Sequence, residues 1–267
     1  MRRWLAIAAC VVLAPWAGTP TSAVASPPFE LRTGRELSLL VAGGLLGAAA
    51  FVIQDGRSPL DAAALDRLDA ADINTLDRGA AMHWSEAAAG ASDKLVAALL
   101  VAPAGIAVAG GFDDARAVPL VMYAETMLLT SGITQLLKGA VPRVRPYVYN
   151  DDPAIPAESK LTVDARRSFP SSHAANAFAA AVFLARVHDA YNPDSRARPW
   201  VWAGALAVAT TTATLRCVAG QHFPTDVVAG AAIGAVAGWA VPALHRVCGD
   251  DRVTLDMGRG VAVSLRF

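Results

Sequence analysis

Residues 216–244 read RCVAGQHFPTDVVAGAAIGAVAGWAVPAL, a polar cluster that runs directly into an apolar stretch. Pro224 favours the first turn of a helix, and residues 227–244 contain no charged side chain. Glycines recur on one helix face, at i, i+4 and i+8, as Gly230, Gly234 and Gly238. Because glycine lets helix backbones approach closely, this stretch predicts a tightly packed helix with its reactive residues near its N-terminus.

Five further apolar stretches precede this one along the chain. They are Leu37–Gln54, Leu95–Gly111, Ala117–Leu137, Ala174–Ala185 and Val201–Leu215. The first of them carries a second group of close glycines, Gly43, Gly44 and Gly47, to which the same packing argument applies. The length of each stretch lies near or below the lower limit for a membrane-spanning helix, which has about 17–25 residues. We therefore expect an all-α, six-helix bundle that is transmembrane, with a buried soluble bundle as the open alternative.

The composition also favours a membrane protein. Of 267 residues, 54% are hydrophobic and 17% are charged, and the mean hydropathy is +0.39. Ordinary soluble domains have about 45–50% and about 25%. Lys and Arg together number 23, as do Asp and Glu, so there is no overall positive charge and we expect no nucleic-acid partner. The three cysteines, Cys10, Cys217 and Cys248, lack the spacing of a zinc site or of a disulfide framework.

The first 25 residues have the pattern of a secretory signal peptide. Met1 is followed by two arginines, residues 4–17 are uncharged, and Ala23-Val24-Ala25 supplies the small residues of a cleavage site. The alternative is an uncleaved first membrane span, although 14 residues are short for a hydrocarbon core of about 30 Å.

The remainder of the chain divides where the composition changes. Residues 26–117 hold N-terminal helices and an acidic segment, Asp55–Lys94, whose amphipathic helices we expect outside the membrane as a scaffold or lid. Residues 118–245 hold three polar clusters. Residues 246–267 end in alternating apolar and polar positions around Gly258-Arg259-Gly260, which predicts a tail with a small β-hairpin.

The first polar cluster follows the third apolar stretch. Lys138, Arg143 and Arg145 stand close together, and Pro146 stops any further helical turn. Basic residues at a helix C-terminus also interact favourably with the helix dipole, so an ordinary solvent-exposed helix end is the alternative.

The second cluster, Ser168-Phe-Pro-Ser-Ser-His173, directly precedes the fourth apolar stretch. Its hydroxyls, imidazole and backbone amides converge on a helix N-terminus, where unpaired N–H groups and the helix dipole favour an anion. An ordinary serine N-cap is the alternative.

The third cluster lies between the fifth and sixth stretches and contains Arg216, His222 and Asp226. On a helix that starts near Pro224, the Asp226 carboxylate can reach one nitrogen of His222 and leave the other free to attack. A surface His–Asp pair would have the same spacing.

Together the clusters supply cations, backbone amides, two histidines and a carboxylate, the groups that phosphoryl transfer needs. Their patterns are Lys-x6-Arg-Pro, Pro-Ser-x-His and Arg-x5-His-x3-Asp. In order and spacing, residues 118–245 resemble the type 2 phosphatidic acid phosphatase and vanadium haloperoxidase superfamily. The residues that carry the resemblance are Lys138, Arg145, Pro146, Pro170, Ser171, His173, Arg216, His222 and Asp226.

The resemblance implies a phosphatase that needs no metal and no other cofactor, with residues 118–245 as its catalytic core. His222 would attack phosphorus and form a phosphohistidine, Asp226 would hold the ring of His222, and His173 would act as general acid. The phosphoryl oxygens would be bound by Lys138, Arg145, Ser171, Ser172 and Arg216.

One position departs from the family pattern. Ser172 stands where the family has glycine, and it adds a Cβ and a hydroxyl; we expect the amide contact to survive. Arg143 and Arg167 fall outside the motifs and are expected to be loop charges or headgroup contacts. Glu125, amid the third apolar stretch, is expected to be a helix–helix hydrogen-bonding partner or a functional acid within the membrane.

Alternating helix directions place all three clusters on one face of the bundle. If residues 1–25 are cleaved and six helices cross, that face lies inside the cell, whereas membrane members of the family place it outside. An uncleaved head, a first stretch that does not span, or a soluble periplasmic bundle would remove the conflict. The opposite face would carry Arg32, Arg35, Arg186, Arg196 and Arg198. By the positive-inside rule we expect a bacterial inner-membrane protein with a periplasm-facing site, or alternatively a soluble periplasmic protein.

Four functions compete. The leading one is hydrolysis of a phosphorylated lipid or isoprenoid, because an active face at a bilayer boundary suits a substrate with a buried tail. The main alternative is a soluble periplasmic non-specific acid phosphatase for small phosphomonoesters. A vanadate-dependent haloperoxidase would share the anion site, and a non-enzymatic membrane scaffold would be indifferent to the loss of His222.

Overall fold

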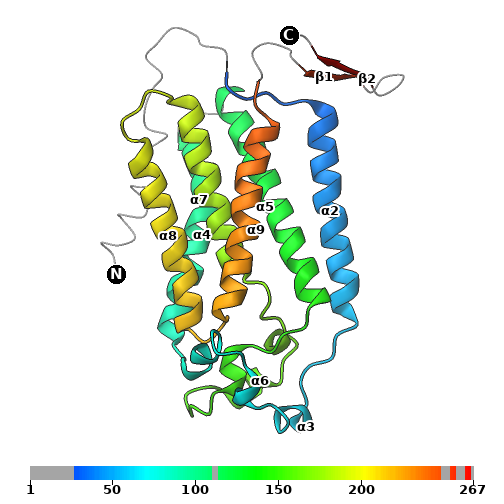
Figure 1. Cartoon of the computed structure of the whole chain (residues 1–267), viewed down its shortest axis with the longest axis vertical. Coiled ribbons are helices and arrows are strands. Elements are labelled where there is room, and N and C mark those ends of the chain that lie inside the picture. The colour runs from blue at the N-terminus through cyan, green and yellow to red at the C-terminus, as the bar shows by residue number, and fades with distance from the viewer. Residues whose placement is uncertain (1–26, 110–113, 248–252, 257–261, 266–267) are drawn as a thin grey trace.

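The computed structural model describes residues 27–109, 114–247, 253–256 and 262–265. Long helices run side by side along the molecule (Figure 1). They are α2 (Thr33–Asp55), α4 (Glu86–Ala109), α5 (Asp114–Ala140), α7 (Ser172–Tyr191), α8 (Arg198–Val218) and α9 (Pro224–Leu244). Each overlaps one of the apolar stretches and extends beyond it, because charged residues at the stretch ends also adopt helical turns. The prediction of a mainly helical chain is confirmed.

Helix α7 lies at the centre of the packing. Its buried residues are mostly alanines, and it packs against α9, α8 and α5. A Cβ built on Gly234 would lie 2.0 Å from the carbonyl oxygen of Ala175, so α9 and α7 touch through their backbones. Gly230 and Gly238 make the same kind of approach, which confirms the packing role of these glycines.

The glycines of α2 divide into two groups. A Cβ on Gly43 would lie 2.6 Å from the side chain of Leu128, so Gly43 is a packing position. Gly44 and Gly47 have nothing within 4 Å of an added Cβ, so the prediction of close packing is wrong for them. The reason is that only one face of α2 meets α5.

Four helices in the described part of the chain are long and apolar enough to cross a membrane. They are Thr33–Asp55, Ala117–Ala140, Arg198–Val218 and Pro224–Leu244. On α2 the large apolar side chains point away from the protein, and Phe51 and Val52 are 71% and 72% exposed. Such a surface is stable in lipid rather than in water, so the chain is a membrane protein.

The connecting segments gather at one end of the helices (Figure 1). The short helices there are α3 (Ala62–Leu65), η2 (Ala70–Asp72), η3 (Arg78–Met82), η4 (Pro146–Tyr149), α6 (Ala157–Lys160) and η5 (Asp164–Arg166). Small apolar clusters hold them; one includes Leu60, Tyr147 and Ile155. The acidic segment Asp55–Lys94 contributes only single turns here, and residues 86–94 belong to α4, because Ser85 Oγ accepts from the N–H of Ala88 and caps that helix.

The far end of the molecule carries the chain's last described elements. Strands β1 (Val253–Asp256) and β2 (Ala262–Leu265) pair antiparallel. The predicted turn at residues 258–260 and the predicted signal peptide both lie outside the described residues. At the same end, the N–H of Glu30 donates to the carbonyl oxygen of His245 at 3.0 Å, which joins the start of α2 to the end of α9.

Candidate active site

Four helix ends meet in one polar site at the end of the bundle that the short helices cover (Figure 1). Helices α5 and α8 finish there and bring Lys138 and Arg216, and α7 and α9 begin there and bring His173 and Asp226. His222 lies in the turn between α8 and α9. The structure therefore brings the three sequence clusters together.

His222 is buried, and the backbone orients its ring. It is 1% exposed, and its Nδ1 lies 2.7 Å from the carbonyl oxygen of Ser168. Because a carbonyl only accepts hydrogen bonds, Nδ1 carries the hydrogen and Nε2 keeps its lone pair. Nε2 lies 3.5 Å from Nη1 of Arg145. The site thus holds a nucleophilic nitrogen beside a cation.

The surroundings of His222 favour its neutral form. Burial lowers the pKa of the ring well below its ordinary value, and the positive charges of Arg145, Lys138 and Arg216 lower that pKa further. His222 is therefore an unprotonated imidazole at neutral pH.

Asp226 does not make the hydrogen bond to His222 that its spacing predicts. Its Oδ2 lies 3.8 Å from Nδ1 of His222, an ion-pair distance rather than a hydrogen bond. Oδ2 instead accepts from Ser168 Oγ at 2.5 Å and from the N–H of Phe223 at 2.9 Å. The Asp226 carboxylate is held at the N-terminus of α9, where unpaired amides favour an anion. The Ser168 carbonyl, rather than Asp226, orients the His222 ring.

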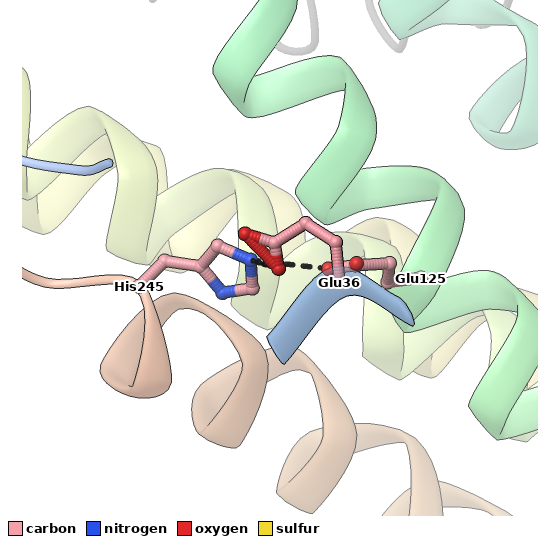
Figure 2. A group of neighbouring side chains, drawn as sticks. All are labelled: Glu36, Glu125 and His245. Atoms are coloured by element: carbon pink, nitrogen blue, oxygen red, sulfur yellow. Dashed lines mark ion pairs between the residues drawn. The ribbon is translucent and has the colours of Figure 1, made fainter. Parts of the chain in front are cut away.

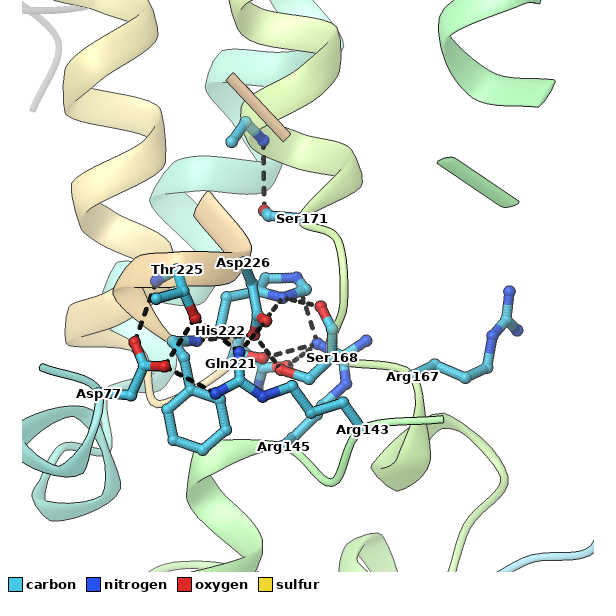
Figure 3. A network of polar contacts seen from close by, with 12 residues as sticks. Asp77, Arg143, Arg145, Arg167, Ser168, Ser171, Gln221, His222, Thr225 and Asp226 are labelled. Carbon is cyan, nitrogen blue, oxygen red and sulfur yellow. Dashed lines mark hydrogen bonds and ion pairs between the residues drawn. The ribbon is translucent and has the colours of Figure 1, made fainter. Parts of the chain in front are cut away.

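Arg143 extends the network around Asp226 (Figure 3). It donates to Asp226 Oδ1 at 2.5 Å, to Thr225 Oγ1 at 2.7 Å and to Asp77 Oδ2 at 2.7 Å. Its guanidinium also lies 4.2 Å from the centre of the Phe223 ring. The expectation that Arg143 is a loop charge or headgroup contact is therefore wrong, because the guanidinium is taken up by two carboxylates of the site.

Asp77 reaches the site from the acidic segment, as a scaffold contact. It accepts from the N–H and from Oγ1 of Thr225, at 3.0 and 2.6 Å. Burial raises the pKa of Asp77, but hydrogen bonds from Thr225, Arg143 and Asn74 outweigh this and lower the pKa to about 2. Sequence reasoning missed Asp77, because nothing in its local sequence separates it from the other acids of that segment.

The three cations of the motifs are nearly buried, and each is 6% exposed. Lys138 Nζ donates to the carbonyl oxygen of Arg167 at 2.6 Å, and Arg145 Nη2 donates to Asp164 Oδ1 at 2.9 Å. Nε of Arg216 is buried and has no hydrogen-bond partner among the described residues. Buried cations with unused donors favour an anion between them, and they would repel a metal cation at the same place.

His173 lies in the first turn of α7, in contact with a carboxylate that no motif contains. Its Nε2 is 2.7 Å from Asp93 Oδ1, and the same oxygen accepts from Nη1 of Arg216 at 3.1 Å. Sequence reasoning missed Asp93, because it stands in a charged helical turn of α4 far from the clusters. Asp93 links a general-acid candidate to a phosphate-binding candidate.

The two serines before His173 differ in their contacts. Ser171 Oγ accepts from the N–H of Ala174 at 3.3 Å, so Ser171 is the N-cap of α7. Ser172 Oγ is buried and has no hydrogen-bond partner in the part of the chain that the structure describes. The Ser172 hydroxyl, which the glycine of the family pattern would lack, is thus a donor available to a bound anion.

The turn that carries His222 requires glycine at position 220. Gly220 has a φ of 67°, and a Cβ there would lie 2.2 Å from the carbonyl oxygen of His83. Its own carbonyl accepts from the N–H of Tyr147 at 2.9 Å. The backbone of the first cluster is thereby fixed to that of the third.

Comparisons with known proteins find a matching family model, a similar curated protein and a similar solved structure. Residues 119–249 match the family model described as "PAP2 superfamily". The Lipid A 4'-phosphatase of Bacteroides thetaiotaomicron is 35% identical over 108 residues, which cover 39% of this chain and 43% of that protein. The chain thus matches less than half of the length of this curated relative. A crystal structure of a transmembrane PAP2 type phosphatidylglycerolphosphate phosphatase from Bacillus subtilis aligns with 78% of this chain and 94% of its own, at 20% identity and a TM-score of 0.35.

Proposed function

Because residues 119–249 belong to the PAP2 superfamily, we propose that this protein is a phosphatase that hydrolyses a phosphate ester or diphosphate of a lipid or isoprenoid. The reaction would use no metal and would pass through a phosphohistidine. The observation that carries the proposal is His222, whose Nδ1 is held by the Ser168 carbonyl while Nε2 lies 3.5 Å from Arg145. A lone pair that faces an anion-binding cation has the geometry needed for attack on phosphorus.

In the first step, Nε2 of His222 forms a bond to phosphorus as the bond to the leaving oxygen breaks. Lys138, Arg145 and Arg216 offset the charge on the other phosphoryl oxygens, and Ser171 and Ser172 add hydroxyl and amide donors. His173 gives a proton to the leaving oxygen.

In the second step, water attacks the phosphohistidine and gives a proton to His173. The new P–O bond forms as the P–N bond breaks, and inorganic phosphate leaves. Asp93 would position His173, and Asp226 with Arg143 would position the start of α9 and the turn before it, which carries His222. These three are positioning residues, because they act through the histidines rather than on the phosphoryl group.

A lipid substrate is supported by the place of the site in the molecule. The site lies at the ends of helices that are long and apolar enough to cross a membrane, so it would sit at a bilayer boundary. The relative named Lipid A 4'-phosphatase agrees with a lipid-linked phosphate. We therefore favour a substrate whose tail stays in the bilayer over a small water-soluble ester.

For the arrangement in the cell, we propose that the six long helices form one bundle across the bacterial inner membrane, with the site on the periplasmic side. Residues 118–245 would form the catalytic core, 26–117 the preceding helices and scaffold, and 246–267 a hairpin tail. This orientation requires that the signal-like residues 1–25 stay on the cytoplasmic side, neither cleaved nor inserted as a span, or that α2 does not span. The mean hydropathy of α2, 2.0, favours the first of these.

The proposal is tested by phosphate release in detergent with EDTA present. The substrates are phosphatidic acid, phosphatidylglycerol phosphate, undecaprenyl diphosphate and para-nitrophenyl phosphate. The variants are His222→Ala and, as a matched loss of a buried histidine in the last turn of α7, His188→Ala. We expect selectivity for a lipid, a loss of at least about 10⁴-fold in His222→Ala, and activity retained in His188→Ala.

Three results would contradict parts of the proposal. Activity on para-nitrophenyl phosphate alone would replace the lipid substrate with small phosphomonoesters. Undiminished activity in His222→Ala, or failure to trap an acid-labile, base-stable phosphoenzyme in the wild type, would exclude the histidine nucleophile.

A further inference from the structure

Three ionisable side chains from three elements meet at the end of the bundle opposite the active site. They are Glu36 in the first turn of α2, Glu125 in the middle of α5, and His245, which directly follows α9 (Figure 2). Nε2 of His245 lies 3.1 Å from Oε2 of Glu125 and 3.3 Å from Oε2 of Glu36. Helix α9, at about 1.5 Å per residue over 21 residues, puts this group about 30 Å from His222.

Two members of the group are buried, and some of their polar atoms have no hydrogen-bond partner among the described residues. Glu125 and His245 are both 0% exposed. Both carboxylate oxygens of Glu125 and Nε2 of His245 lack a hydrogen-bond partner among the described residues. A buried carboxylate without partners is costly, so these atoms form a place that favours a cation.

The ring of His245 is set up to offer a lone pair. Its Nδ1 lies 2.8 Å from the carbonyl oxygen of Val241, an acceptor, so Nδ1 carries the hydrogen of the neutral ring. Nε2 then presents its lone pair to two carboxylates, which repel it. A histidine whose second nitrogen is held by a backbone carbonyl is also the usual arrangement of a metal ligand.

Nearby charge compensates only part of the group. Arg35 Nη2 donates to Glu36 Oε1 at 2.9 Å, and Arg35 Nη1 donates to the carbonyl oxygen of Leu244 at 2.7 Å. The arginine therefore neutralises one carboxylate from the outer side. On the inner side, no lysine or arginine among the described residues forms an ion pair with Glu125, so a bound cation would find no competing positive charge beside this carboxyl group.

We propose that Glu36, Glu125 and His245 bind a divalent transition-metal ion of the zinc class. Ligands at bond lengths of about 2.0–2.1 Å around a tetrahedral ion are about 3.3 Å apart, close to the two distances from His245. Two carboxylates and an imidazole suit this class better than Mg²⁺ or Ca²⁺, which prefer oxygen ligands alone. A water molecule would complete the coordination.

The ion would serve as a structural link rather than as part of the phosphatase reaction. It would join the start of α2 to α5 and to the end of α9, whereas the helix-to-helix packing of α2 is mainly on α5. Metal-free protein is therefore expected to keep phosphatase activity at low temperature and to unfold at a lower temperature.

The test uses the full chain purified in detergent, stripped with a chelator and then titrated with Co²⁺ or Zn²⁺. We expect one ion per chain, a visible d–d spectrum of the Co²⁺ form, and a raised Tm on addition of metal. Glu125→Gln and His245→Gln should each weaken binding at least about 100-fold, since loss of a supporting outer residue alone costs 10–100-fold. His188→Gln, a change of another buried histidine at the same end, should bind as the wild type does.

Wild-type protein that binds no ion and shows no change of Tm would overturn the proposal and leave a proton on His245 as the compensating charge. Unchanged affinity in the variants would also overturn it, by placing the metal elsewhere. Should the buried variants fail to fold, Glu36→Gln at the outer edge of the group gives the same comparison. None of these readouts depends on phosphatase activity, so they are independent of the proposed function.

Discussion

At the scale of single residues, Ser168 contacts both His222 and Asp226. Its carbonyl accepts from His222 and its hydroxyl donates to Asp226, so one residue connects the proposed nucleophile to the carboxylate four positions along the chain. The ring orientation therefore depends on a backbone group that no side-chain substitution at position 168 removes.

Arg143 is expected to act on the rate of the chemical step. Arg143→Gln removes charged hydrogen bonds to Asp226 and Asp77, and each such bond is worth about 1.5–3 kcal/mol. We expect kcat to fall about 10–100-fold with little change in KM, as measured by steady-state kinetics on the preferred lipid. The control is Arg167→Gln, because the Arg167 side chain points away from the network toward Gln135 (Figure 3). Equal losses in both variants would refute a special role for Arg143.

The burial of neutral His222 predicts a pH dependence of stability. Its folded pKa is lowered, so below the ordinary value of about 6.5 the unfolded state binds more protons than the folded state. Stability then falls on acidification from about pH 6.5, by at most about 1.4 kcal/mol per pH unit. Between pH 7.5 and pH 5.0 the Tm of the wild type should drop further than that of His222→Gln. Equal drops would show that His222 does not titrate on unfolding.

The sequence motifs predicted which side chains share the site, but not all of their contacts. A separation of four residues predicts that Asp226 lies near His222, but it does not predict the contact with the Ser168 carbonyl, which comes from 54 positions away. Asp77 and Asp93 stayed hidden for the same reason. Each reaches the site because a distant segment of the chain folds against a helix end. Neither residue belongs to a sequence motif that could have identified it.

At the scale of elements, the contact between α7 and α9 leaves no room for an added side-chain atom at the glycines of α9. Gly234→Ala would place a Cβ 2.0 Å from the carbonyl oxygen of Ala175. This is a backbone atom, so it cannot move away by a change of rotamer. We expect a loss of about 1–3 kcal/mol or more, seen as a lower Tm in detergent. Gly44→Ala on α2, where nothing lies within 4 Å, should be neutral or slightly stabilising. A tolerated Gly234→Ala would mean that the two helices can separate.

Apolar runs predicted the positions of the long helices better than their ends. Helix α4 begins at Glu86, nine residues before the apolar stretch at Leu95, because Ser85 caps a charged but helical turn. The glycines show the same limit. Gly43 and Gly44 are adjacent in sequence, but only the face of α2 that carries Gly43 meets another helix.

At the scale of the whole molecule, the orientation in the membrane is open to a labelling experiment. In a chain without Cys10, Cys217 and Cys248, Ser58→Cys places a thiol at the site end and Asp194→Cys places one at the other end; both positions are exposed. With the proposed orientation, an impermeant maleimide should label Ser58→Cys in intact cells. It should label Asp194→Cys only after permeabilisation, and the reverse pattern would put the active site inside the cell.

The closely packed centre of the molecule has a consequence for turnover. Helix α7 fills the middle of the bundle with alanines, and the glycines of α9 pack directly against its backbone. The hydrocarbon chain of a lipid substrate would therefore stay in the bilayer, outside the bundle. Only the headgroup would travel to His222. For the proposed lipid substrate, the encounter would then be a two-dimensional search within the leaflet. The rate would follow the mole fraction of substrate in the membrane surface rather than its concentration in the bulk.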